Sequence, residues 1–273
     1  HRSSQGVRAR PLPHTMNTRG PALMTLEEAL QRVLDAATPL GRSEWVPLLQ
    51  ADGRVLAQDV VSELQVPPND NSAMDGYAVR AAEVVVGQSA TVSQRIAAGH
   101  AASPLLPGTC ARIFTGAPMP AGADAVVMQE DVEAVDAQVR WLKPATPGTH
   151  VRRAGEDVAL GAVVLRVGDR LTPAGVGLAA SLGVAQLCVA QRPRVALLTT
   201  GDELVMPGTT APRDMASGHI YNSNRFVLGS LLQRLGCEVS DFGNVPDSRD
   251  ATVAVLRDAA EHHDLILSSG GVS

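Results

Sequence analysis

The segment 194–204, RVALLTTGDEL, decides the fold of the last third of the chain. Arg194 to Thr199 is almost continuously apolar, as expected for a strand that is covered on both faces of a parallel sheet. Further helices and strands are expected at short intervals: a helix capped by Ser223 or Asn224 and ended by Gly236, a strand from Glu238, a helix from Ser248 to about His262, and a strand over Leu265–Leu267. This alternation predicts a doubly wound parallel sheet over residues 191–273.

Ligands of doubly wound sheets bind beyond the carboxyl ends of the strands. In this sequence those ends carry two loops of glycine and short polar residues, Thr200-Gly201-Asp202-Glu203 and Ser269-Gly270-Gly271. Three strands are fewer than the roughly four to six that are usual, and the sequence stops where the next helix would begin. We therefore expect the α/β domain to be incomplete and the sequence to be truncated.

Two further helices are predicted upstream of this sheet. Thr25 and Glu28 have the spacing of a capping box, and apolar residues then recur at helical intervals until Pro39. Thr172-Pro173 provides a cap and a first-turn proline for the second helix, and Gly183 ends it. We interpret residues 21–62 and 162–190 as two segments of one helical, elongated connector domain.

The region between these two segments changes to short β-rich runs separated by Gly and Pro. Strands are expected in and just after it at Val84–Val86, Ala111–Phe114, Ala125–Met128 and Val163–Val167. Residues 67–72, PPNDNS, have turn chemistry and are expected to form a boundary loop. The pattern predicts a β-rich domain over residues 63–161 that is inserted into the connector.

Composition excludes several kinds of partner. The net charge of −5 and the few aromatic residues (two Trp, two Tyr, three Phe) provide neither the basic surface nor the stacking rings that nucleic acid requires. The three cysteines form no CxxC pair, which favours free thiols in a reducing compartment. The sequence has no apolar run of membrane-spanning length and no signal-peptide pattern, so we expect a cytoplasmic protein. Residues 1–20 are expected to be a disordered tail or a remnant of cloning.

Five loops combine short polar side chains with glycine or proline: residues 70–76, 115–118, 155–157, 200–203 and 245–247. Mg²⁺ in proteins binds one or two carboxylates together with substrate phosphates, and glycine lets backbone N–H groups approach a phosphate. Each loop taken alone is explained at least as well by a turn or a structural hydrogen bond. Arg152-Arg153 either hold an anion or form a solvated basic patch. The sequence lacks HExxH, GxSxG, a Walker lysine loop and a GxGxxG after a strand, which disfavours the enzymes that use them.

Taken together, these loops lie in long and unusual strings. The strings are DNSAMDGYAVR (70–80), RIFTGAPMPAGADAVVMQED (112–131), VRRAGEDV (151–158), RVALLTTGDEL (194–204), IYNSNR (220–225) and DLILSSGGVS (264–273). From about residue 24 to the end, the sequence resembles the molybdopterin molybdenumtransferase family, to which the C-terminal domain of gephyrin is related. The resemblance implies a homodimer whose subunit has a connector domain, an inserted β-rich domain and a molybdopterin-binding α/β domain.

The resemblance also implies a reaction and the residues that serve it. The family inserts molybdate into adenylylated molybdopterin and releases AMP with the help of Mg²⁺. The matching positions are Asp75, Thr115, Asp157 and Glu203 as catalytic residues, Asp247 as a metal ligand, and Gly201, Asp202, Ser269, Gly270 and Gly271 as cofactor-binding residues. Asp157 and Glu203 are expected to orient substrate groups or relay protons, and Asp247 to hold Mg²⁺ against the pyrophosphate. Other proteins of molybdenum cofactor biosynthesis are further candidate partners.

Two departures from the family pattern stand out. The family usually has Asp where this chain has Asn222, and Asn lacks the charge of a metal ligand but can still cap a helix or form a turn. Family members also continue past GGVS with loops that complete the pocket, so weak activity or none is expected of this sequence. Two alternative functions remain open: a non-catalytic dimeric scaffold, and a molybdopterin adenylyltransferase, although the latter usually lacks the inserted β-rich domain.

Overall fold

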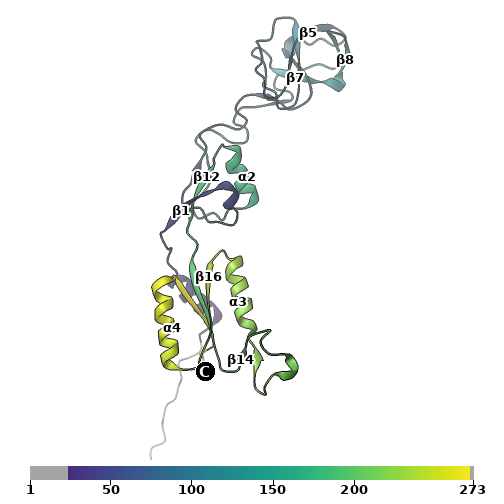
Figure 1. The fold of residues 1–273 in the computed structure, drawn as a ribbon. Coiled ribbons are helices and arrows are strands. Elements are labelled where there is room, and N and C mark those ends of the chain that lie inside the picture. Colours follow the sequence, from purple (N-terminus) through teal and green to yellow (C-terminus); the bar gives the residue numbers. More distant parts are fainter. Residues whose placement is uncertain (1–23, 271–273) are drawn as a thin grey trace, which may run out of the picture. The chain divides into compact units, whose positions relative to one another are not determined.

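The structure is a computed structural model that describes residues 24–270, and the chain divides between Leu40 and Gly41 into two separately packed units (Figure 1). The first unit contains α1 (Leu26–Ala36). The predicted capping box is confirmed, because Thr25 Oγ1 accepts from Glu28 N at 3.2 Å and Glu28 Oε2 accepts from Thr25 N at 3.0 Å. The predicted tail over residues 1–20 lies outside the described residues. None of the helices within residues 24–270 is long and apolar enough to cross a membrane.

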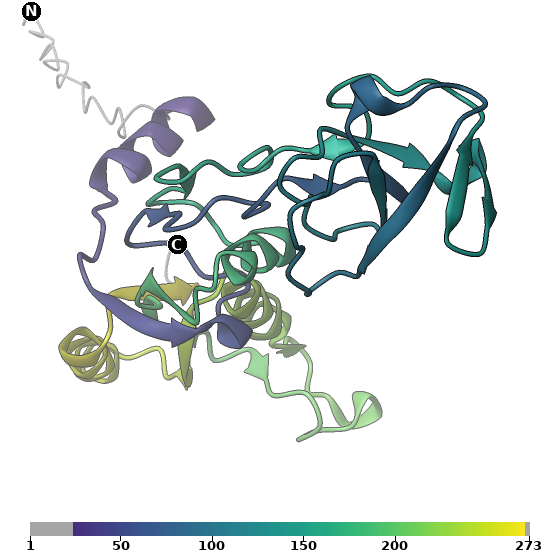
Figure 2. The same ribbon diagram turned by 90° about the horizontal axis from the view of Figure 1, so that it is seen from above.

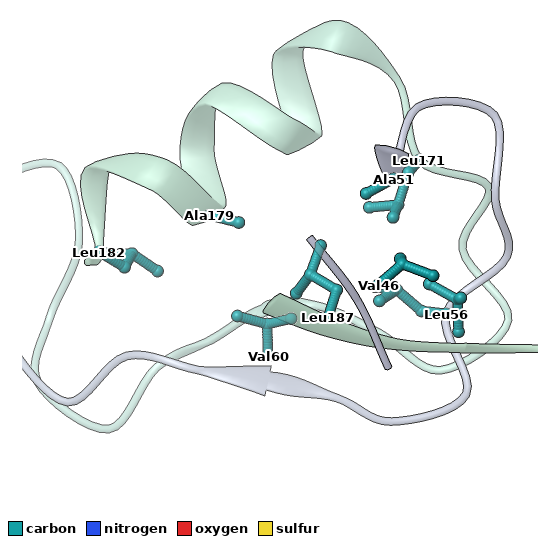
Figure 3. Packing of buried hydrophobic residues seen from close by; sticks show 9 residues of the cluster. Val46, Ala51, Leu56, Val60, Leu171, Ala179, Leu182 and Leu187 are labelled. Atoms are coloured by element: carbon teal, nitrogen blue, oxygen red, sulfur yellow. The ribbon is translucent and has the colours of Figure 1, made fainter. Parts of the chain in front are cut away.

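The second unit begins with a small layered core. Strand β1 (Ser43–Pro47) pairs antiparallel with β12 (Gln186–Ala190), and β2 (Val60–Val61) pairs antiparallel with β11 (Val163–Leu165). The short helix η1 (Leu48–Gln50) follows β1, and α2 (Pro173–Ser181) begins at the predicted Thr172 cap. Figure 3 shows Ala179 and Leu182 of the α2 segment facing Leu187 and Val60 across this core. Residues far apart in the sequence thus share one core.

A six-stranded sheet lies between the two halves of that core in the sequence. Its order is β7-β4-β6-β5-β9-β8, with β5 and β6 parallel and the other pairs antiparallel. The elements are β4 (Gly76–Val79), η2 (Ala81–Glu83), β5 (Ser89–Ile96), β6 (Thr109–Ile113), β7 (Ala125–Met128), η3 (Gln129–Asp131), β8 (Val132–Val135) and β9 (Gln138–Trp141). Figure 2 shows these strands, in blue and teal, from a second side.

Both faces of this sheet are covered. Tyr77 and Val79 of β4 belong to one buried cluster and Ala78, between them, belongs to the other, as the two-residue period of a strand requires. Two sequence predictions are wrong in detail. Residues 84–86 form no strand, because they follow η2 into a turn in which Gln88 N donates to Val85 O at 3.0 Å. The expected boundary loop over 67–72 ends in a strand, β3 (Asn71–Ser72), which pairs antiparallel with β10 (Val151–Arg152).

The remaining sheet is parallel, as predicted, with the order β16-β13-β17. It consists of β13 (Arg194–Thr200), β16 (Glu238–Val245) and β17 (Leu265–Ser269), connected by α3 (Ser223–Arg234) and α4 (Arg249–His262). The chain moves from β13 to the edge strand β16 and then back across the sheet to β17, so right-handed crossovers place α3 and α4 on opposite faces (Figure 1). An excursion between β13 and α3 holds β14 (Leu204–Val205), η4 (Pro212–Asp214) and β15 (Ile220–Tyr221).

The cap of α3 differs from the prediction. Asn222, rather than Ser223 or Asn224, is the N-cap, and its Oδ1 accepts from Arg225 N at 3.3 Å. The same side chain is buried and donates to Thr199 Oγ1 at 2.7 Å. The helix therefore begins one residue earlier than a Ser223 cap would allow and two residues earlier than an Asn224 cap would allow, because a buried hydroxyl on the sheet holds the asparagine in place.

Candidate functional site

Asp75 and Thr115, two of the predicted catalytic residues, are in direct contact. The Asp75 Oδ1 atom accepts from both the backbone N and the hydroxyl of Thr115, each at 2.8 Å. Adjacent backbone bonds fix this contact, since Gly116 N donates to Ser72 O at 2.8 Å and Ser72 N donates to Ala117 O at 2.9 Å. The two loops that carry the pair are thereby paired like short strands.

The pair presents hydrogen-bond acceptors to a ligand. A threonine hydroxyl has one proton, and that of Thr115 is donated in the hydrogen bond to Asp75. The Thr115 oxygen therefore offers a ligand only its lone pairs. The Thr115 N–H and hydroxyl, followed by the charge of Arg112, hold the pKa of Asp75 below its usual value, and the carboxylate stays ionised. This arrangement suits a ligand that donates hydrogen bonds.

Gly76 is required by close packing directly after Asp75. A Cβ at this position would lie 2.1 Å from the carbonyl oxygen of Val127, because β4 passes close against β7 here. The glycine in the SAMDG string thus lets the Asp75 turn run into the buried sheet.

Asp157 lies in a second group of charges, on the loop that follows β10. Its carboxylate accepts from Arg152, which raises the pKa of that guanidinium. Arg153 Nη1 donates to Asp70 Oδ2 at 2.6 Å, and Ala154 N donates to Asp70 Oδ1 at 2.8 Å. Each arginine of the pair that sequence reasoning considered for anion binding is therefore matched by a carboxylate. The β3–β10 pairing holds this loop against the segment that leads to Asp75.

The α/β sheet carries a cavity of about 180 Å³ at the carboxyl ends of β13 and β17. Its lining is polar except for Leu204 and Ile220 and comes from the predicted loops, the excursion and the start of α3, namely Thr200, Glu203, Leu204, Ile220, Tyr221, Asn222, Ser223, Asn224, Ser269 and Gly270. Asn224 Nδ2 donates to Ser269 Oγ at 3.0 Å. Gly270 has a φ of +104°, and a Cβ there would lie 2.6 Å from Thr200 O, so only glycine fits. Gly271 lies outside the described residues.

Glu203 lines this cavity, and Gly201, Asp202 and Asp247 lie in the loops that follow β13 and β16. The Glu203 carboxylate folds back over Gly201, whose carbonyl oxygen accepts from Asn244 Nδ2 at 2.9 Å. Asp202 Oδ1 accepts from Asp247 N at 3.4 Å, so the ends of β13 and β16 bring two acidic residues together. Two carboxylates fit a Mg²⁺ ion that is held mainly by substrate phosphates and water. Among residues 24–270, no group of three or more His, Cys, Asp or Glu side chains could hold a metal alone.

The predicted residues thus fall into two groups. Asp75, Thr115 and Asp157 belong to the loops beside the six-stranded sheet, and Gly201 to Glu203, Asp247, Ser269 and Gly270 belong to the parallel sheet. No hydrogen bond or ion pair joins the two groups within the described part of the chain. Within residues 24–270 of one chain, the candidate residues therefore form two polar sites that no hydrogen bond or ion pair connects.

Sequence reasoning missed residues that hold these sites together. Arg112 and Gln129 lie beside Asp75, and Asn244 supports the Gly201 loop. Arg112 and Gln129 occur in the long string 112–131, but their bonds depend on the β4–β6 and β4–β7 registers, which the sequence does not state.

Fold and sites together define a multidomain α/β and β-rich protein with polar loops at the carboxyl ends of a parallel sheet. The chain belongs to the family described as MoeA N-terminal region (domain I and II), which matches residues 24–183. Residues 196–273 match the family described as probable molybdopterin binding domain. The predicted family and fold class are confirmed.

Individual relatives agree with this placement. The chain is 39% identical over 253 residues to the molybdopterin molybdenumtransferase of Haemophilus influenzae, covering 92% of this chain and 62% of that protein. It is 44% identical over 249 residues to molybdopterin molybdenumtransferase 2 of Mycobacterium tuberculosis, covering 89% and 60%. A crystal structure of the molybdopterin biosynthesis moeA protein from Pyrococcus horikoshii OT3 aligns with a TM-score of 0.82 at 34% identity, covering 90% and 66%. The chain spans about 60% of the length of these two curated relatives.

Proposed function

We propose that this protein is a molybdopterin molybdenumtransferase that inserts molybdate into adenylylated molybdopterin and releases AMP. The observation that carries the proposal is the cavity at the carboxyl ends of β13 and β17, with Glu203, Ser269 and Gly270 in its lining. The names of the relatives support the substrate class. We further propose a cytoplasmic homodimer with the three-domain organisation expected from the sequence, in which residues 63–161 form the inserted domain.

The two polar sites have different roles in this proposal. The loop after β17 binds phosphate oxygens of the nucleotide or pterin through backbone N–H groups, and Gly201 and Asp202 contact the same ligand. Glu203 and Asp157 orient substrate groups or move protons at the pterin sulfurs. Asp75 and Thr115 accept hydrogen bonds from the substrate.

Magnesium enters the proposal through the acidic pair at the sheet edge. Asp247 and Asp202 would hold Mg²⁺, which supplies charge neutralisation at the pyrophosphate when bound. Two asparagines position the elements around the ligand. The Asn244 amide holds the Gly201 loop, and Asn222 caps the start of α3 beside the cavity.

AMP release tests this function directly. Full-length protein is incubated with adenylylated molybdopterin and Mg²⁺, with and without molybdate, and both AMP and protein-bound molybdenum are measured. We expect AMP release to depend on molybdate and to fall at least about a hundredfold in Asp157→Asn and Glu203→Gln. Glu133→Gln is the matched control, because within residues 24–270 the Glu133 side chain pairs only with the exposed Arg140 in β9.

Two other results would redirect the assignment. Formation of adenylylated pterin from ATP would indicate an adenylyltransferase. A scaffold would be indicated by two results together. The unmodified protein would release no AMP, and the variants Asp157→Asn and Glu203→Gln would still dimerise and bind partners.

A further inference from the structure

Arg112 of β6 stands at the centre of a polar and aromatic cluster beside Asp75. In the antiparallel register of β4 and β6 it lies opposite Tyr77, and its guanidinium carbon is 5.2 Å from the centre of the Tyr77 ring. The same carbon is 4.5 Å from the centre of the Phe114 ring. Arg95, its register partner on β5, lies 4.7 Å from the same Phe114 ring. Aromatic faces therefore restrain the plane of the Arg112 guanidinium.

The hydrogen bonds of Arg112 are directed at the turn that carries Asp75. Arg112 Nη1 donates to Gly76 O at 2.8 Å, and Nη2 donates to Gln129 Oε1 at 2.6 Å. Gln129 N in turn donates to Asp75 O at 3.1 Å. One guanidinium thus joins both sides of the turn, and a single lysine ammonium could not reproduce this fork.

The consequence for Asp75 follows from this arrangement. Gln129 N donates to the backbone carbonyl of Asp75, and Arg112 donates to the carbonyl of Gly76. These two bonds hold the backbone of the turn, so that the Asp75 carboxylate stays directed at Thr115. Glycine at position 76 cannot restrain the turn by itself, because its backbone is intrinsically the most flexible. We propose that Arg112 is a positioning residue that holds the Asp75 carboxylate and, through it, the Thr115 hydroxyl in the orientation that meets the substrate. The substrate part of this inference rests on the proposed function.

The charges around Asp75 make Arg112 a distinctive partner. Titratable side chains on the elements packed against Asp75 are Tyr77 on β4, Cys110 and Arg112 on β6, and Glu130 and Asp131 on η3, whereas β7 carries none. Asp131 is paired with Lys143 at 2.7 Å. Arg112 is the positive charge that favours the ionised form of Asp75.

Two measurements on the full-length protein test the role of Arg112. The titration of the Asp75 carboxyl is followed by NMR with ¹³C-labelled aspartate, using Asp75→Asn to assign the signal, and molybdate-dependent AMP release is measured on the same variants. In Arg112→Gln we expect the Asp75 midpoint to move to higher pH and kcat to fall about tenfold or more. In Arg112→Lys, which keeps the charge, the midpoint should return toward that of the unmodified protein, with partial recovery of kcat.

Arg95→Gln is the matched control. Arg95 contacts the same Phe114 ring, but within residues 24–270 it donates no hydrogen bond to Gly76, Gln129 or Asp75, so both readouts should stay near those of the unmodified protein. The inference is overturned if Arg112→Gln matches Arg95→Gln in both readouts, or if it lowers only the unfolding midpoint. If the unmodified protein releases no AMP, the proposed function fails. The pH midpoint of the Asp75 titration then decides the role of Arg112 by itself. Should Arg112→Gln fail to fold, Arg112→Lys and Gln129→Ala carry the same test.

Discussion

The two polar sites of this molecule are built by opposite means. Beside the six-stranded sheet, carboxylates are held by partners from the same chain, as Asp75 is by Thr115 and Asp70 by Arg153. At the parallel sheet, Asp202 and Glu203 lie in one loop beside Gly201, and Asp202 Oδ1 accepts from Asp247 N at a long distance, 3.4 Å. The comparison indicates a preformed site in one region and a site with free hydrogen-bonding capacity in the other.

The physical reason lies in the sheets that carry the sites. Antiparallel neighbours in the six-stranded sheet face each other directly, so side chains from β4 and β6 meet in register. A parallel sheet instead leaves its carboxyl ends open at the point where strand order reverses, and the loops there leave backbone groups free for ligand. Substitutions in the two sheets and at the two sites should therefore have different consequences.

Close packing at Gly76 should dominate the stability of the six-stranded sheet. Gly76→Val places a side chain against the Val127 carbonyl and should cost about 3 kcal/mol or more, or prevent folding. Urea unfolding measures the loss. Gly177→Ala in α2, where a Cβ has open space, is the matched control and should be neutral or slightly stabilising. A mild effect of Gly76→Val would show that β4 and β7 can separate.

The two sites should respond differently to magnesium. Asp75→Asn should lower molybdate-dependent AMP release about a hundredfold without changing the Mg²⁺ concentration that gives half the maximal rate. Asp247→Asn should raise that concentration roughly tenfold, because a metal ligand is lost. Titration of AMP release with Mg²⁺ separates the two variants, and equal Mg²⁺ dependence in both would contradict the assignment of Asp247.

The base of the parallel sheet should show a pH-dependent stabilisation. Asp264 has a side chain that is only 10% exposed, and Arg194 donates to its Oδ1 at 3.1 Å, which together with the Arg194 backbone N–H lowers the pKa of Asp264. A lowered folded pKa stabilises the protein above the usual aspartate pKa of about 3.9, and the contribution is lost as the pH falls through the folded pKa. Asp264→Asn should cost about 2 kcal/mol at pH 7.

Urea unfolding of both proteins at pH 7, 5 and 3 measures this contribution. The difference between the unmodified protein and Asp264→Asn should be full at pH 7 and 5 and should shrink at pH 3. A difference that is constant across this range would contradict the role of the Asp264 carboxylate.

Asn222 should contribute a smaller amount at the α/β site. Asn222→Ala removes the α3 cap and the bond to Thr199 and should cost about 1 kcal/mol. Asn222→Ser retains a capping oxygen and should recover part of the loss, and both are measured by thermal unfolding. Equal stability of Asn222→Ala and the unmodified protein would show that α3 needs no side-chain cap.

The sequence alone determined the parallel sheet, α1 and α2, because each depends on local patterns. Continuous apolar runs, capping residues and terminal glycines act over a few residues, and β13, α2 and α4 appear where those signals predict them. The strings that carry the family resemblance likewise lie within single segments. Asp75, Thr115 and Glu203 could therefore be selected before any contact was known.

The support of those residues depends on contacts between segments that are distant in the sequence. The strand β3 needs β10 from 80 positions later, and the Arg112 bond to Gly76 needs the β4–β6 register. Asn222 became the cap because a buried Thr199 hydroxyl lies within its reach. Such contacts join segments that are distant in sequence, and side-chain identity does not specify which distant backbone group a donor will meet. The division of the candidate residues into two sites has the same cause, because it follows from which strands pair.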